Sequence, residues 1–265
     1  MMTQRSSNGT VYELSGPEDA PVIALVHGLG LNRHTWEAHA PVFSERYRVL
    51  NYDLYGHGES VPPPTKPSLS IFAQQLKELL DELEIERCAV VGFSLGGMIN
   101  RRFALDFPDR ATALAILNSP HERGEEAQRA VEERASKSAA GGPGATLDTT
   151  LKRWLTPNFL ENEPWMIERI RQWVMANEPD VYAQCRWVLA NGVIEIIRPD
   201  PPLTLPTLVM TCENDTGSTP AMSHAIASEI PNSQTIIVPE LQHLGLLERP
   251  ELFTTPIMQF LKDEI

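Results

Sequence analysis

Short apolar runs alternate with amphipathic helical patterns along most of the sequence, and this alternation restricts the fold more than any other feature. Six runs have the length of buried strands, at residues 21–26, 47–53, 88–91, 113–117, 207–210 and 235–238. Helical patterns occupy residues 71–83, 95–106, 220–230 and 248–263. Such an order predicts an α/β fold, with a mostly parallel central sheet and helices on both faces. Residues 10–14 alternate in polarity and predict an antiparallel edge strand.

The alternation stops between residues 120 and 203. Strand-like runs nearly vanish there, charged helical stretches such as 125–137 appear, and Gly141-Gly-Pro-Gly144 interrupts them. The same segment holds four of the five tryptophans, which are Trp154, Trp165, Trp173 and Trp187. We interpret residues 120–203 as a helical cap inserted into a core domain formed by residues 1–119 and 204–265.

Charge and composition exclude several classes of partner. The net charge of −13 repels nucleic acids and anionic membrane surfaces, and no run approaches the 18 apolar residues of a membrane span. The first residues lack the apolar stretch of a secretion signal, which predicts a cytoplasmic location. The three cysteines are odd in number and show no C-x-x-C spacing, so we expect them to pack as small buried residues.

One serine lies at the junction of a predicted strand and a predicted helix. The motif Gly92-Phe93-Ser94-Leu95-Gly96 directly follows the apolar run 88–91 and opens the helix 95–106. A G-x-S-x-G motif in this position is typical of a nucleophile elbow, a tight turn that needs glycines and holds the serine in a strained conformation. This context makes Ser94 the candidate nucleophile.

A serine hydroxyl is a weak nucleophile at neutral pH and needs a neighbouring base. His243 follows the last predicted strand and precedes the last predicted helix, which makes it the best candidate among seven histidines. His27 belongs to a different loop motif. His57 lies in the turn Gly56-His57-Gly58, where its ring is expected to satisfy backbone groups.

The base in turn needs a carboxylate that orients it. Asp215 follows the strand 207–210, and Glu213 is its competitor. The end of the fourth buried strand, at Asn118 and Ser119, is another location for an acid, but no carboxylate stands there. The resulting chain order of Ser94, Asp215 and His243 is the order expected for a nucleophile-elbow hydrolase.

Two backbone N–H groups are candidates for an oxyanion hole, which stabilises negative charge on the carbonyl oxygen of the transition state. Leu95 follows the nucleophile at the start of a helix. Leu29 lies in His27-Gly28-Leu29-Gly30, directly after the first buried strand. The alternative is that this second segment is a plain glycine-rich turn.

Together these motifs resemble those of the α/β-hydrolase superfamily over nearly the whole chain outside the cap. The matching segments are HGLG at 27–30, DLYGHGES at 53–60, GFSLGG at 92–97, ENDTGSTP at 213–220 and QHLGLLERP at 242–250. Among these proteins, the chain is most similar to 3-oxoadipate enol-lactonase-like hydrolases and small carboxylesterases. Two residues depart from the usual pattern: Tyr55 stands where arginine is usual, and Cys212 where glycine is common.

The resemblance implies the α/β-hydrolase fold and cleavage of an ester or lactone through an acyl-enzyme, without a metal or organic cofactor. A hydrolase of C–C bonds in ring-cleavage diketones uses the same three residues and is the main alternative. A ligand receptor with little turnover is a second. A homo-oligomer is as compatible with the sequence as a monomer.

The substrate is expected to be a small molecule bound beneath the cap. The cap tryptophans Trp154, Trp165 and Trp187 are candidate pocket residues, although such a stripe also serves to attach a cap to its core. Arg123, shortly after the fourth buried strand, is a candidate to hold a substrate carboxylate, with a surface salt bridge as the alternative role.

Overall fold

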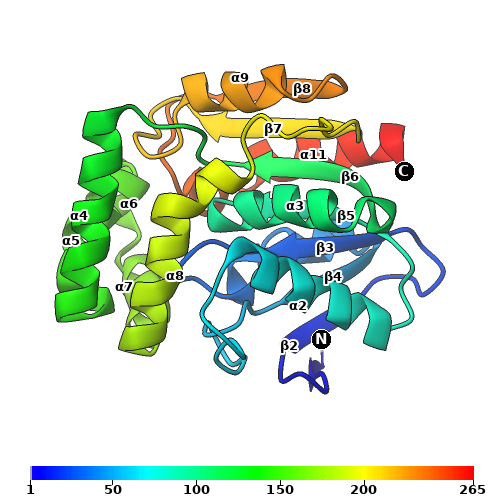
Figure 1. Cartoon of the computed structure of the whole chain (residues 1–265), viewed down its shortest axis with the longest axis horizontal. Helices are drawn as coiled ribbons and strands as arrows, with labels where there is room; N and C mark the ends of the chain where they lie inside the picture. Colours follow the sequence, from blue (N-terminus) through cyan, green and yellow to red (C-terminus); the bar gives the residue numbers. More distant parts are fainter. Residues whose placement is uncertain (1) are drawn as a thin grey trace.

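A single eight-stranded sheet organises the protein in the computed structural model, which describes residues 2–265. The strand order is β1-β2-β4-β3-β5-β6-β7-β8, parallel from β4 to β8 (Figure 1). The strands are β1 (Thr3–Arg5), β2 (Val11–Ser15), β3 (Val22–Val26), β4 (Arg48–Tyr52), β5 (Cys88–Phe93), β6 (Ala111–Leu117), β7 (Thr207–Cys212) and β8 (Ser233–Val238). The predicted α/β class and parallel sheet are confirmed.

The edge of the sheet differs from the prediction. Residues 11–15 form β2, which pairs antiparallel with β4 as expected, but β1 pairs on its other side. The expectation that residues 10–14 form the edge strand is therefore wrong. β1 is three exposed polar residues long, so it has neither the length nor the apolar alternation by which a strand is detected in a sequence.

Helices cover both faces of the sheet. α2 (Leu69–Glu82) and α3 (Leu95–Asp106) pack against each other, and α3 lies on β5 and β6. α11 (Glu251–Glu264) contacts α1 (Ala40–Phe43) and lies behind the sheet in Figure 1. The remaining core helices are α9 (Pro220–Ser228) and α10 (Gly245–Glu248), and short 3-10 helices occupy Arg33–Trp36, Pro108–Arg110, Pro143–Thr146 and Gly192–Glu195.

The segment expected to form the cap is helical and lies between β6 and β7 in the chain. Its helices are α4 (Glu125–Gly141), α5 (Leu147–Trp154), α6 (Pro157–Asn162), α7 (Pro164–Met175) and α8 (Pro179–Asn191). They gather beyond the carboxyl ends of β6 and β7, and α4 packs along α8 (Figure 1). The loops that follow the parallel strands begin at this same edge of the sheet. Open α/β sheets bind their ligands at this edge.

The central strands form the middle of the core, and β5 is buried along its whole length. Cys88, Cys185 and Cys212 are free and buried, as predicted. Burial raises the pKa of each thiol to about 12, so all three are protonated at neutral pH. A Cβ built on Gly245 would lie 2.6 Å from the sulfur of Cys212, so this cysteine packs closely against the start of α10.

Candidate active site

The serine of the G-x-S-x-G motif occupies a strained turn between β5 and α3. Its φ of 55° lies in the left-handed region that residues with a Cβ rarely adopt. A Cβ at Gly92 would lie 2.2 Å from the Gly96 carbonyl oxygen, and one at Gly96 would lie 2.2 Å from that of Val26. Only glycine fits at either position, so the local sequence imposes the turn that presents Ser94 at the start of α3.

Ser94, His243 and Asp215 form one hydrogen-bonded chain. Ser94 Oγ lies 3.1 Å from His243 Nε2, and His243 Nδ1 lies 2.6 Å from Asp215 Oδ2. An ionised carboxylate only accepts hydrogen bonds, so Nδ1 carries the ring proton and Nε2 is free to accept the serine proton. The structure thus brings together the three residues that the sequence selected, each at a carboxyl-terminal edge of the sheet.

The carboxylate of Asp215 is held by more donors than His243 alone. Gly217 N–H and Ser218 N–H donate to Oδ1 at 2.8 and 3.0 Å, and the Asn118 amide donates to Oδ2 at 2.9 Å. Burial raises the pKa of this carboxyl, but His243 and these hydrogen bonds outweigh burial and hold the pKa below its ordinary value. Asp215 therefore stays ionised throughout the neutral range.

The competing acid lies elsewhere. Glu213 is exposed, and its carboxylate accepts a hydrogen bond from the Glu240 backbone rather than from His243. Asn118, whose amide contacts Asp215, was not identified by the sequence interpretation, although that interpretation considered this strand end as a location for an acid. The feature of the sequence that could have identified Asn118 is its position directly after β6, because β6 lies beside β7 in the sheet and Asp215 follows β7.

The loop that carries Leu29 lies against Ser94. A Cβ on Gly28 would lie 3.2 Å from that of Ser94, and both Gly28 and Leu29 line the same cavity as Ser94. Within residues 2–265, neither the Leu29 nor the Leu95 N–H donates to another protein group. The two predicted donors are thus available to a ligand atom beside Ser94.

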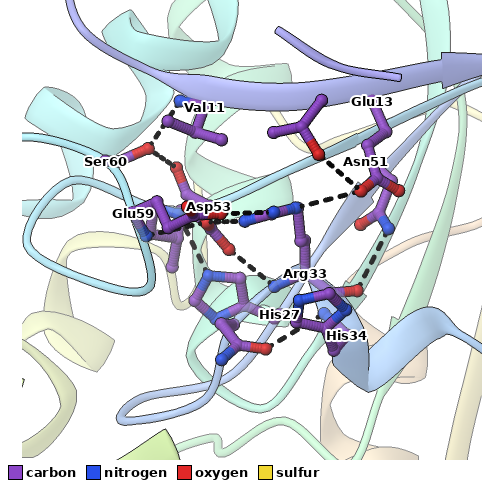
Figure 2. Close-up of polar contacts among 12 residues, drawn as sticks. Val11, Glu13, His27, Arg33, His34, Asn51, Asp53, Glu59 and Ser60 are labelled. Atoms are coloured by element: carbon purple, nitrogen blue, oxygen red, sulfur yellow. Dashed lines mark hydrogen bonds and ion pairs between the residues drawn. The ribbon is translucent and has the colours of Figure 1, made fainter. Parts of the chain in front are cut away.

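Buried polar contacts fix this loop to its neighbours (Figure 2). His27 Nε2 accepts a hydrogen bond from Leu54 N–H at 3.0 Å, so its Nδ1–H donates to the Gly28 carbonyl at 2.8 Å. Downstream, Asp53 accepts hydrogen bonds from the Arg33 backbone N–H at 2.7 Å and from its guanidinium at 2.5 Å. Figure 2 shows Arg33 extending from this pair towards Glu13 and Glu59, so several segments hold the loop.

The turn that contains His57 is also internally bonded. His57 Nδ1 lies 3.0 Å from the Tyr55 carbonyl, as expected for a ring that satisfies backbone groups. Tyr55 is buried, and its N–H donates to Gln75 at 2.9 Å. This turn is therefore held without the arginine that is usual at position 55.

A cavity of about 750 Å³, including its open mouth, lies above Ser94 and His243. Trp154 and Arg123 both line it. The Trp154 ring centroid lies 5.9 Å from that of His243, and the Trp154 carbonyl accepts a hydrogen bond from Leu244 N–H. Arg123 donates to the carbonyls of Leu189 and Ala190 and forms no ion pair within residues 2–265, so the alternative role in a surface salt bridge is wrong.

Trp165 and Trp187 do not line this cavity, which corrects the prediction that they are pocket residues. Trp165 is 59% exposed, and its indole donates to Glu163, while Trp187 is 38% exposed. Trp165 lies on the outward face of α7, whose buried residues are Ile170 and Val174. Trp187 is an exposed residue of α8, whose buried residues include Cys185 and Val188. The cavity wall instead contains four arginines, Arg123, Arg134, Arg153 and Arg186, of which the sequence interpretation selected only the first.

Two further observations concern metals and membranes. Within the part of the chain that the structure describes, no three His, Cys, Asp or Glu side chains are grouped so as to hold a metal ion. In the same residues, no helix combines the length and the apolar character needed to cross a membrane.

Comparison with known proteins gives consistent matches over most of the chain. A family model described as the alpha/beta hydrolase family matches residues 23–255. The 3-oxoadipate enol-lactonase 2 of Acinetobacter baylyi is 28% identical over 252 residues, which cover 95% of this chain and 92% of that protein. The (E)-2-((N-methylformamido)methylene)succinate hydrolase of the same organism is 27% identical over 248 residues, covering 94% and 92%.

A solved structure is also similar to this chain over most of its length. The enol-lactonase from Burkholderia xenovorans has a TM-score of 0.88 and 28% identity, and the match covers 96% of this chain and 98% of that one.

Proposed function

The chain belongs to the alpha/beta hydrolase family, and we propose on this basis that it is a serine hydrolase that cleaves a carboxylic ester or lactone through an acyl-enzyme. The observation that carries the proposal is the connected chain from Ser94 Oγ through His243 to Asp215, at one end of a cavity. The names of the similar proteins, an enol-lactonase among them, favour a lactone or ester as the bond cleaved.

In the first half of the reaction, Ser94 Oγ attacks the substrate carbonyl while its proton passes to His243 Nε2. The Leu29 and Leu95 N–H groups would donate to the carbonyl oxygen as it becomes negative. His243 then gives the proton to the leaving oxygen, and the C–O bond breaks to leave an acyl group on Ser94. Asp215, ionised and hydrogen-bonded to Nδ1, stabilises the imidazolium that forms between these steps.

In the second half, water attacks the acyl group, again with His243 as base, and the acid is released with free Ser94. The overall change is ester plus water to acid plus alcohol; a lactone gives a single hydroxy acid. The same three residues would also serve hydrolysis of a C–C bond. A test of the proposal must therefore vary both the bond and the serine.

We expect Ser94→Ala to lower kcat for p-nitrophenyl acetate and for a simple lactone by at least about 10⁴-fold, because the nucleophile is lost. A fluorophosphonate should add its mass to Ser94 in the wild type and not in the variant. Ser228→Ala is the matched control, since Ser228 is an exposed serine on α9 outside the cavity.

Three results would contradict the proposal. Retained turnover in Ser94→Ala would remove the nucleophile. Turnover of ring-cleavage diketones without any turnover of esters or lactones would favour the C–C hydrolase. Tight ligand binding with no turnover of any of these substrates would favour a receptor.

A further inference from the structure

The lining of the cavity divides into two halves with different chemistry. The core supplies Ser94 and His243, while the cap supplies four arginines, listed here by element: Arg123 before α4, Arg134 on α4, Arg153 on α5 and Arg186 on α8. The only carboxylate in the lining is Asp215, which is committed to His243. The whole chain has a net charge of −13, so the positive charge of this cavity wall does not follow from the overall composition. It comes from the local placement of the four arginines.

Protein groups do not neutralise these arginines. Within residues 2–265, Arg134 and Arg153 form no ion pair and no side-chain hydrogen bond, and Arg123 Nε is buried without a partner. Arg186 bonds only neutral groups, donating to the Tyr182 hydroxyl at 2.9 Å and the Thr146 hydroxyl at 3.4 Å.

Carboxylates close to the cluster in sequence are engaged elsewhere. Glu133, next to Arg134, pairs with Lys137 at 2.7 Å. Asp148, on the same helix as Arg153, pairs with Arg171 at 2.5 Å. Neither of these two neighbouring carboxylates therefore forms an ion pair with the cluster.

The arginines are also close enough to repel one another. Burial, and then the charge of Arg134, lower the pKa of Arg123 to about 10. Burial, followed by Arg134 and Arg186, lowers the pKa of Arg153 to about 10, with Asp215 acting in the opposite direction. Gathering partly buried like charges costs free energy unless an anion compensates them.

From this arrangement, and resting on the proposed function, we infer that the substrate is an ester or lactone whose acid part carries at least two further carboxylates, bound by the cap arginines. A guanidinium binds a carboxylate with two parallel hydrogen bonds, and a single carboxylate would leave most of the cluster unpaired. Apolar groups in the lining, Leu29, Phe93, Trp154 and Leu189, suit a carbon skeleton between the charges.

The chemistry at Ser94 is unchanged by these extra groups. Water is consumed, the ester C–O bond breaks, and the products are an alcohol and an acid with one more carboxylate than the substrate. The bound carboxylates take no part in bond making, so their effect is on binding and orientation of the scissile carbonyl. This product is a tricarboxylate or higher acid.

A series of methyl esters tests the inference directly. Methyl butanoate has no carboxylate, monomethyl succinate has one, and the monomethyl ester of tricarballylate has two. We expect kcat/KM to rise at least about tenfold with each carboxylate, since each charge-assisted pair in a low-dielectric cavity is worth at least that factor. Added NaCl should lower kcat/KM for the dianion and leave the neutral ester nearly unchanged.

Substitutions assign the effect to the cluster. In Arg134→Gln and in Arg153→Gln, the ratio of kcat/KM for the dianionic ester to that for the neutral ester should fall at least about tenfold. Arg129→Gln is the matched control, because Arg129 is an exposed arginine on the same helix as Arg134 and outside the cavity lining. It should leave the ratio as in the wild type.

Failure of the inference is distinguishable from failure of the proposed function. Ser94-dependent hydrolysis of the neutral ester with no gain from carboxylates would overturn the inference alone. If no ester is turned over, calorimetric titration with tricarballylate still tests the inference. Binding to the wild type that weakens about tenfold in Arg134→Gln supports the carboxylate site. No binding to the wild type overturns the inference. Tighter binding of inorganic phosphate than of tricarballylate would contradict the choice of carboxylates.

Discussion

Asn118 shows how a single amide can complete a site that motifs alone do not describe. Its φ of 45° places it in the left-handed region at the end of β6, and its amide donates to both Asp215 and the Thr211 hydroxyl. The first of these bonds adds a neutral donor to a buried carboxylate that must stay ionised and correctly oriented. We therefore propose that Asn118 acts through Asp215 and not on the substrate.

We expect Asn118→Gly to lower kcat about tenfold with little change in KM. Glycine adopts the left-handed backbone without strain, so the variant removes the amide and little else. Loss of a donor to the charged form raises the pKa of Asp215 only towards its ordinary value, so the carboxylate stays ionised above pH 5; the expected effect is poorer orientation of Asp215 towards His243, with a similar fall in kcat from pH 5 to 8. The measurement is kcat and KM from pH 4 to 8.

Asn232→Gly serves as the control, because the Asn232 side chain donates to the Thr204 carbonyl, away from the cavity. A purely structural role for Asn118 would lower thermal stability while leaving kcat of the folded enzyme unchanged, and that result would contradict the assignment.

Residues that act through local motifs could be predicted from the sequence, and residues that act across the sheet could not. Ser94 follows from its own strand, turn and helix, and His243 and Asp215 follow from strand ends. The role of Asn118 depends on β6 lying beside β7, a pairing that no local pattern encodes. Trp165 and Trp187 were misplaced because helical spacing in the cap does not say which face is covered.

At the scale of elements, the cap is hydrogen-bonded to the segment that follows His243. The Glu248 carboxylate on α10 accepts hydrogen bonds from Thr156 N–H at 2.8 Å and from the Thr156 hydroxyl at 2.6 Å. Together with the bond from Leu244 N–H to the Trp154 carbonyl, these contacts tie the α5–α6 connection to residues 244–248. The position of Trp154 above His243 is therefore linked to the core.

A double-mutant cycle of Glu248→Ala and Thr156→Ala measures this link. We expect each single variant to lower the free energy of unfolding and the pair to show a coupling energy of about 1–2 kcal/mol, because the Thr156 hydroxyl donates to a charged, partly buried acceptor, whereas the bond from the backbone N–H remains in Thr156→Ala. Thr156 also caps α6, and the cycle cancels that separate contribution. Urea unfolding gives all four free energies.

Additive effects in this cycle, with a coupling below about 0.3 kcal/mol, would show that the cap connection is held by other contacts. Glu251→Ala is the control for loss of a carboxylate nearby, since Glu251 is exposed and bonds Arg249 and not the cap. It should show no coupling to Thr156→Ala.

Helices and strands were predicted correctly where the apolar periodicity was strong. The prediction failed where a strand is short and polar, as in β1, and where a proline sets the start of a helix, as in α11. The six predicted strands appear within a few residues of their expected positions. For the five from β3 to β7, burial on both faces requires continuous apolar runs, whereas β8 is a half-buried strand at the edge. The last helix was predicted from residue 248, yet α10 ends there, and α11 begins after Pro250. β1 is too short and polar to be detected.

At the scale of the whole molecule, three histidines are buried outside the site and held neutral. Burial is the largest influence on each, and the pKa falls to about 4 for His27 and His39 and to about 3 for His57. All three rings still find hydrogen-bond partners: His27 and His57 within the turns already described, and His39 at Thr254 and the Leu246 carbonyl. Each ring fits the fold only in its neutral form.

These histidines predict a loss of stability in mild acid. A group whose pKa is lower in the folded chain takes up its proton first in the unfolded chain, so the free energy of unfolding falls as pH drops from about 6.5 to about 4. Each histidine contributes up to about 1.4 kcal/mol per pH unit in that window. The lowered pKa of Asp215 acts in the same direction only below this window, and the raised pKa of Glu248 opposes it.

Urea unfolding at half-unit steps from pH 4.5 to 7.5 measures the slope. We expect His39→Gln to lower the stability at pH 7, where its imidazole contacts are lost, and to reduce the slope between pH 4.5 and 6 by up to about 1.4 kcal/mol per unit, because one neutral imidazole no longer has to be maintained. His224→Gln, at an exposed position on α9, should leave the slope as in the wild type. An unchanged slope in His39→Gln would mean that His39 takes up its proton within the fold, and that the acid sensitivity of the molecule comes from other groups.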